Sequence, residues 1–188
     1  MSFLSKLIFV SNLLFLTVGC AGNDPTKNGV EAYEAGNYEV SYAELKPLSK
    51  DGDRIAQFYM GKMYYSGQGV KKDWAVAIDY YKKSADQGFS KAQNNLGMMY
   101  LNGESVARNA ELGFQWIAKA ADQDLVIAQI HLGVALTYEG SPLSLDRVRG
   151  LHYLEAAASQ NDPNAITKLG GYYADIDKNH KKAGELFE

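Results

Sequence analysis

The side chains best suited to bind a metal or transfer a proton at neutral pH are three histidines, His131, His152 and His180. Their separations match no ligand spacing of a zinc site. The carboxylates Asp73 and Asp79 could form an acid–base pair, but helix caps and solvated helix faces commonly carry such residues. The sequence contains no Ser-x-x-Lys, His-Glu-x-x-His or Gly-x-Ser-x-Gly motif. We therefore expect no catalytic residue, no bound metal and no cofactor.

The run GQG at residues 67–69 is the one glycine-rich segment that could hold a phosphate group. A phosphate-binding loop follows a strand and continues into Gly-Lys-Ser or Gly-Lys-Thr, and neither feature is present here. Gly67, Gly103 and Gly140 instead recur in register, so the sequence predicts chain reversals between helices at these three positions.

The single cysteine, Cys20, follows an apolar N-terminal segment. Lys6 is the only charged residue among the first twenty, and an apolar run extends from Leu7 to Val18. These twelve residues would form a helix of about 18 Å at ~1.5 Å per residue, too short for a ~30 Å hydrocarbon core. The sequence therefore predicts a cleaved export signal at residues 1–19.

The residues before and including the cysteine, TVGC, resemble the lipobox of bacterial lipoproteins, although Thr17 stands where leucine is most common. The resemblance implies that Cys20 is lipidated and anchors the protein to the envelope membrane. Ala21 in the next position implies the outer membrane, facing the periplasm. Ordinary cleavage after Ala21, which would give a soluble periplasmic or secreted protein, is the alternative. The polar residues 20–28 are predicted to be a flexible tether.

The remainder of the chain repeats itself every 36 or 37 residues. Ala56, Ala92, Ala128 and Ala165 begin equivalent segments, and a period of this length indicates a repeat architecture. Each segment has apolar residues and a glycine at spacings that share one face of a helix. The members are Ala56, Met60, Gly61 and Tyr64; Ala92, Leu96, Gly97 and Tyr100; Ala128, Leu132, Gly133 and Leu136; and Ala165, Leu169, Gly170 and Tyr173. Because glycine within a helix costs about 1 kcal/mol relative to alanine, we expect a second helix to approach closely at the repeated glycine.

A second helix is predicted in each unit. Asp73, Asn109 and Asp146 precede these helices as N-caps. Gly88, Asp124 and Asn161 follow them, and all three residue types tolerate the left-handed conformation that ends a helix.

The segment AQFYMGKMYYSGQGVKKDWAVAIDYYKKSADQG and its copies resemble the Sel-1-like repeat, a branch of the tetratricopeptide-type helical repeats. The resemblance implies an all-α fold, a right-handed α-solenoid of stacked antiparallel helix pairs, over residues 29–188. We expect a half unit at 29–53, units at about 54–90, 91–126 and 127–162, and a partial unit at 163–188. The fourth unit departs from the pattern, because ADIDKN replaces the glycine turn.

The first helices of the units are expected to line a concave face. Positions that differ in type between otherwise faithful copies are those that packing does not dictate, and they are predicted to contact a partner. These are Ile55, Tyr59, Lys62, Lys91, Asn95, Met98, Ile127, His131, Val134 and Lys168. Packing between repeats is the alternative role for Tyr59 and Met98.

The formal net charge of −3 and the scattered lysines give no footprint for nucleic acid. The prediction is a non-enzymatic adaptor or scaffold that binds a protein or peptide on the concave face. One alternative, implied by similar exported repeat lipoproteins, is an immunity protein that neutralises a secreted toxic effector. A further alternative is an enzyme acting on the cell wall, although the chain lacks the paired cysteines of the relatives described in that way.

Overall fold

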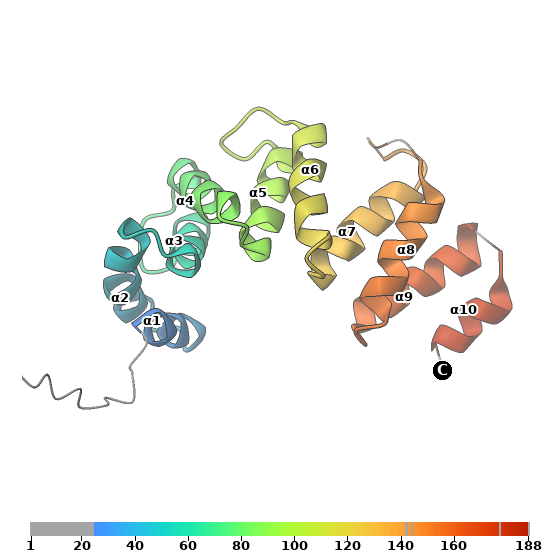
Figure 1. Cartoon of the computed structure of the whole chain (residues 1–188), viewed down its shortest axis with the longest axis horizontal. Coiled ribbons are helices and arrows are strands. Elements are labelled where there is room, and N and C mark those ends of the chain that lie inside the picture. The colour runs from blue at the N-terminus through green and yellow to red at the C-terminus, as the bar shows by residue number, and fades with distance from the viewer. Residues whose placement is uncertain (1–24, 142, 144, 177, 188) are drawn as a thin grey trace, which may run out of the picture.

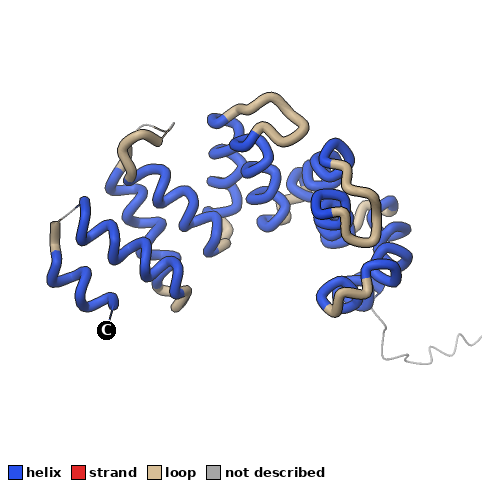
Figure 2. Tube along the Cα trace, turned by 180° about the vertical axis from the view of Figure 1, so that it is seen from behind, coloured by secondary structure: helices blue, strands red, loops and turns tan. Residues whose placement is uncertain are grey.

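The computed structural model describes residues 25–188 except 142, 144, 177 and 188. Within the described residues every regular element is a helix and no strand is present (Figure 2). The helices follow one another along an arch, with α1 at one end and α10 at the other (Figure 1). The predicted signal at 1–19 and the predicted lipidation at Cys20 lie outside the described residues.

The helices of the described part of the chain form five successive antiparallel pairs. The pairs are α1 (Pro25–Glu34) with α2 (Tyr38–Lys50), α3 (Arg54–Ser66) with α4 (Trp74–Asp86), α5 (Ser90–Asn102) with α6 (Ala110–Ala121), α7 (Val126–Thr137) with α8 (Arg147–Ala158), and α9 (Pro163–Gly171) with α10 (His180–Phe187). Each second helix also packs against the first helix of the next pair. The result is the all-α solenoid that the repeat pattern predicts.

The first pair is more complete than the sequence suggested. The expected half unit began at residue 29 after a tether at 20–28, but α1 begins at Pro25 and packs along α2. The end of the predicted tether is therefore helical.

The repeated glycines Gly61, Gly97 and Gly133 mark close contacts within their helix pairs, as predicted. A Cβ on Gly97 of α5 would lie 2.7 Å from the carbonyl oxygen of Gly113, and a Cβ on Gly113 would lie 2.8 Å from that of Gly97. Gly133 and Gly150 make the same reciprocal approach between α7 and α8. In the α3–α4 pair the side chain of Tyr81 packs over Gly61 instead.

The predicted helix boundaries are also confirmed. Asp73 accepts bonds of 3.0 Å from the amides of Ala75 and Val76, and Asn109 and Asp146 cap α6 and α8 in the same way. The predicted helix terminators and reversal positions have positive φ; they are Gly67, Gly88, Gly103, Asp124, Gly140 and Asn161.

A glutamine clasp, defined here by Gln57, Gln93 and Gln129 and their partners, joins successive pairs. Gln57 Nε2 donates to the carbonyl of Ser49 in the preceding pair at 3.1 Å, while its Oε1 accepts from Gln87 at the end of α4 at 2.8 Å. The same arrangement recurs at Gln93 with Ala85 and Gln123, and at Gln129 with Ala121 and Gln160. The three central glutamines are almost fully buried, so each clasp satisfies polar groups that water cannot reach.

Substitution of Gln93 by leucine should lower the free energy of unfolding by about 1–3 kcal/mol, because the carbonyl of Ala85 and the amide of Gln123 lose their buried partner. Chemical denaturation followed by circular dichroism would measure the change. Gln115→Leu on the exposed side of α6 is the matched control and should change stability by less than about 0.5 kcal/mol. Equal losses in the two variants would contradict a role for the clasp.

The last pair departs from the repeat. The position equivalent to Gln57 is Ile166, so the clasp is missing. After α9 the chain continues as one π-helical turn, Tyr172–Ile176, in place of a glycine reversal. The turn is anchored by Tyr173, whose hydroxyl donates to Glu155 of α8 at 2.8 Å and accepts from Lys182 of α10.

Candidate functional site

The first helices, α3, α5, α7 and α9, carry all of the positions predicted to contact a partner. Lys91, Ile127 and Lys168 are exposed in the structure, and six of the others are partly exposed: Ile55, Lys62, Asn95, Met98, His131 and Val134. Tyr59 is the exception, because only 8% of it is exposed.

In the N-terminal part of this surface, the predicted residues Tyr59 and Lys62 contact other side chains of the solenoid. The hydroxyl of Tyr59 donates to Glu34 at 2.9 Å, and its ring packs edge-on against Tyr33 and Phe58. Burial and the bond to Glu34 raise the pKa of Tyr59 to about 12. Lys62 Nζ lies 4.4 Å from the ring centroid of Tyr33 and 5.1 Å from that of Tyr59, and burial lowers its pKa. Tyr59 therefore packs within the solenoid, the alternative role considered for it, and is removed from the accessible surface.

The C-terminal part of the surface is different, because four of the predicted residues line one hollow. Met98, His131, Val134 and Lys168 come together in a cavity of about 480 Å³, here called the central hollow. Leu101 of α5, Phe114 of α6, Ile130 and Ala135 of α7, and Asn164 of α9 complete its lining. The stacking of α5, α7 and α9 brings together side chains that are 70 residues apart in the sequence.

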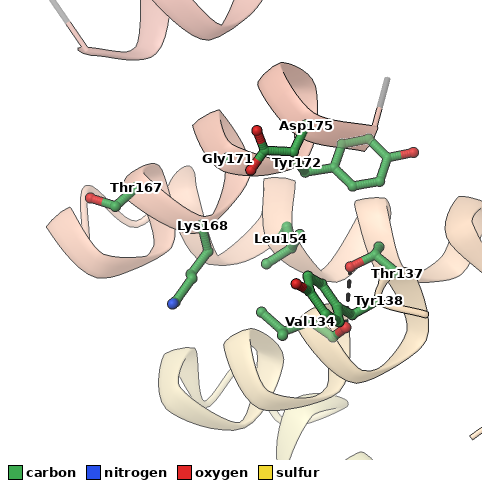
Figure 3. Close-up of a pocket in the computed structure, with 9 residues that line it drawn as sticks. All are labelled: Val134, Thr137, Tyr138, Leu154, Thr167, Lys168, Gly171, Tyr172 and Asp175. Carbon is green, nitrogen blue, oxygen red and sulfur yellow. Dashed lines mark hydrogen bonds between the residues drawn. The ribbon is translucent and has the colours of Figure 1, made fainter. Parts of the chain in front are cut away.

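A second cavity of about 240 Å³, the C-terminal hollow, adjoins the central hollow, and Val134 and Lys168 line both. Figure 3 shows its lining residues converging from α7, α8, α9 and the π-helical turn. They are Val134, Thr137, Tyr138, Leu154, Thr167, Lys168, Gly171, Tyr172 and Asp175. Thr137 donates its hydroxyl to the backbone of Gly133 and Val134, so this side chain is used within its own helix. Figure 3 shows the bond to Val134.

A third and smaller cavity of about 120 Å³, the N-terminal hollow, shares Met98 with the central one. It is lined by Tyr65, Tyr81, Asn95, Met98, Met99 and Glu104. The N-terminal and central hollows share Met98, the central and C-terminal hollows share Val134 and Lys168, and the three together are called the groove below. Methionine and aromatic side chains present adaptable apolar contacts along it, and a few polar groups are placed between them.

His131 lies at the centre of the groove. Its Nδ1 is 3.2 Å from Oδ1 of Asn94, an almost fully buried side chain on the neighbouring first helix. Burial lowers the pKa of His131, so the imidazole is neutral near pH 7. A neutral ring held by one hydrogen bond offers its other nitrogen to a ligand.

Several groove residues were missed by sequence reasoning. Tyr172 and Asp175 line the C-terminal hollow because the π-helical turn directs them there, and the repeat pattern predicted a turn of unspecified shape at ADIDKN. Phe114 belongs to a second helix, a class of position taken to be core. The signal available was the variable position at Gly171, directly before Tyr172.

The described residues contain no group of three or more histidine, cysteine or acidic side chains that could hold a metal ion. Among the same residues, none of the helices has both the length and the apolar character needed to cross a bilayer. The chemistry present in the groove is that of non-covalent recognition: apolar contacts, aromatic rings, and the charges of Lys168, Asp175 and Glu104.

Stacked antiparallel helix pairs with a groove along their first helices define the tetratricopeptide-like α-solenoids, a class of protein-interaction folds. The family model described as Sel1 repeat matches residues 54–89, 90–125, 126–162 and 163–188. The chain belongs to the Sel1 repeat family.

Two solved structures and one sequence relative agree with this assignment. A Sel1 repeat protein from Oxalobacter formigenes is 31% identical with a TM-score of 0.80, covering 88% of this chain and 67% of that one. The protein c5321, a protective antigen of uropathogenic Escherichia coli strains, is 27% identical with a TM-score of 0.78, covering 87% of this chain and 36% of that one. A sel1-like repeat-containing protein of Acanthamoeba polyphaga mimivirus is 46% identical over 43 residues, which are 23% of this chain and 7% of the viral protein. This chain therefore spans only a small part of the viral protein and about a third of c5321.

Proposed function

We propose that this chain is a non-enzymatic adaptor that binds a protein or peptide partner in the groove, while a lipid on Cys20 holds it at the bacterial envelope. The observation that carries the proposal is the convergence of Met98, His131, Val134 and Lys168 on the central hollow. These positions differ in type between copies of the repeat, so the packing that the copies share does not dictate their identity. Met98 and Val134 also pack against neighbouring core side chains. The Sel1 repeat fold is in general suited to protein–protein interaction.

The shape of the groove favours an extended or helical peptide segment over a small molecule. Three hollows linked by shared lining residues can each accept one side chain of a peptide, whereas a small-molecule site is usually one concave pocket. Rigid helices present these cavities, so the protein loses little conformational entropy when a partner binds.

The envelope location is proposed from the sequence of residues 1–20. We propose the outer membrane, facing the periplasm, as the site of the anchor, on the ground of Ala21 after Cys20.

The partner can be sought with the full-length chain as bait in detergent-solubilised native envelope. The proposal expects specific retention of one protein by the folded bait. Capture of a toxic effector would assign the immunity role expected as an alternative. Absence of any specific protein, with a folded bait, would contradict the adaptor proposal.

The enzyme alternative is tested separately with cell-wall material and the pure chain. The proposal expects no turnover. Turnover that a single side-chain substitution abolishes would contradict it.

Substitution of Cys20 by alanine should release the protein from the membrane fraction and abolish its labelling with a fatty-acid analogue, because the thioether is the only proposed link to lipid. Fractionation and metabolic labelling of cells that express wild type and variant would measure both effects. Ser11→Ala within the apolar segment is the matched control and should leave both unchanged. Lipid labelling that persists in Cys20→Ala would show that the lipobox interpretation is wrong.

A further inference from the structure

The N-terminal hollow contains a carboxylate oxygen that has no hydrogen-bond partner. Glu104 lines this cavity, and its Oε2 is buried without a partner. A buried acceptor without a donor carries the full cost of its desolvation, and a charged one carries more than a neutral one. Such a group in a cavity calls for a complementary donor.

The fold holds Glu104 firmly in this place. The amide of Glu104 donates to the carbonyl of Met99 at 3.1 Å, which fixes the backbone just after α5. The other carboxylate oxygen, Oε1, accepts from the hydroxyl of Tyr65 and from Nδ2 of Asn102, both at 3.2 Å. Tyr65 is itself fixed, because its ring stacks on Trp74 and its carbonyl accepts the indole N–H. Two donors therefore orient the carboxylate and leave Oε2 for a third.

The remaining lining suits a cation. None of the six residues is basic, so no internal positive charge in the lining neutralises the carboxylate. Tyr65 and Tyr81 present aromatic rings, which attract cations within about 6 Å of their centroids. Asn95 and the thioethers of Met98 and Met99 add neutral acceptors and polarisable contacts. The volume of about 120 Å³ is several times that needed for a single water, so it admits the end of a side chain.

We propose that the N-terminal hollow binds the cationic end of a lysine or arginine side chain of the partner, paired with Glu104. This inference rests on the proposed function, because the side chain would belong to the peptide bound along the groove. Met98 lines both this hollow and the central one, so a peptide bound in the central hollow would contact a side chain that also lines this one. The groove thereby selects a partner with a basic residue at this point.

The test uses small probes that imitate the two side chains, n-butylammonium for lysine and N-propylguanidinium for arginine, with 1-pentanol as a neutral probe. The full-length chain in mild detergent is labelled at its methionine methyl groups and followed by NMR. Met98 and Met99 report on the hollow, and the fully buried Met60 of α3 is the internal reference. We expect saturable shifts at Met98 and Met99 with at least one cationic probe and much weaker shifts with pentanol. The relative affinity of the two cationic probes distinguishes a lysine pocket from an arginine pocket.

Glu104→Gln keeps the shape of the side chain and removes its charge. It should weaken binding of the cationic probe by about tenfold or more, since a buried charge pair is lost. Glu111→Gln, at an exposed position of α6, makes the same change of net charge and should leave probe binding unchanged. Equal shifts with charged and neutral probes on wild type would overturn the proposal whether or not Glu104→Gln folds.

These outcomes are separate from those of the proposed function. If the chain captures a partner from the envelope but the hollow shows no preference for a cation, only the present inference fails. If the cationic probes bind but no partner is found, the hollow is confirmed as a cation site and the adaptor proposal fails.

Discussion

Replacement of Gly97 by valine should separate α5 from α6 and lower the free energy of unfolding by about 3 kcal/mol, at the upper end of the usual range for overpacked cores. The reason is geometric. A Cβ on Gly97 would lie 2.7 Å from the carbonyl oxygen of Gly113 and 3.2 Å from the amide nitrogen of Ile117. Both are backbone atoms of α6, which cannot move aside as a flexible side chain can.

The loss is large relative to the roughly 5–15 kcal/mol that holds a typical domain folded. Thermal and urea unfolding, followed by circular dichroism, would measure it. Gly184→Ala on α10 is the matched control, because nothing lies within 4 Å of its Cβ position. The control should raise stability by up to about 1 kcal/mol, the difference in helix propensity between alanine and glycine. Unchanged unfolding of Gly97→Val would contradict the close-approach explanation for the repeated glycines.

Most of the fold could be predicted from the sequence because the same residue types recur at equivalent positions in successive repeats. A glycine that recurs at Gly61, Gly97 and Gly133 indicates a steric requirement, and the structure shows contacts that a Cβ would violate at each. The caps Asp73 and Asn109 could be placed for the same reason. The helix-capping residues and the recurring glycine therefore predicted the same arrangement of paired helices.

The ends of the repeat were harder to predict. Helix α1 begins in a polar stretch that reads as a tether, and its stability comes from packing on α2, a contact that its own residues do not reveal. The π-helical turn at Tyr172–Ile176 replaces a glycine that the repeat would require. The π-helical turn occurs in only one of the described repeats, so comparison of the repeats with one another could not predict it.

The candidate site was predicted in part, and its accuracy varied along the chain. Comparison of the repeats selected Met98, His131, Val134 and Lys168, which line the central hollow. The same comparison also selected Tyr59. This residue is buried by its contacts with Glu34 and two aromatic neighbours. Variation between copies shows that packing does not fix a residue type, but it does not show whether a unique local contact does.

Glu104 was not predicted to be a site residue, because what distinguishes it is a buried carboxylate oxygen without a hydrogen-bond partner, which a sequence does not reveal. In the sequence it is one of 22 acidic residues, in a turn where a solvated carboxylate is ordinary. Only the positions of Tyr65, Asn102 and the cavity distinguish it from the others.

Val134 is the residue at which a steric block of the groove should have the largest effect. It lines both the central and the C-terminal hollow, and the two cavities of about 480 and 240 Å³ leave room for a larger side chain. Val134→Trp should place an indole ring where partner side chains would lie. Because a few central residues carry most of the energy of an interface, we expect partner affinity to fall about thirtyfold or more, or about 2 kcal/mol.

The affinity of the captured partner for wild type and variant would be measured by titration calorimetry, with thermal unfolding as the check on folding. Val148→Trp is the matched control, because Val148 is 84% exposed on α8 and lines none of the three hollows. Both variants add the same apolar ring, so only the groove distinguishes them. Val134→Trp that folds and binds the partner as tightly as wild type would place the binding surface elsewhere on the solenoid, and the convergence of variable residues on the groove would then need another explanation.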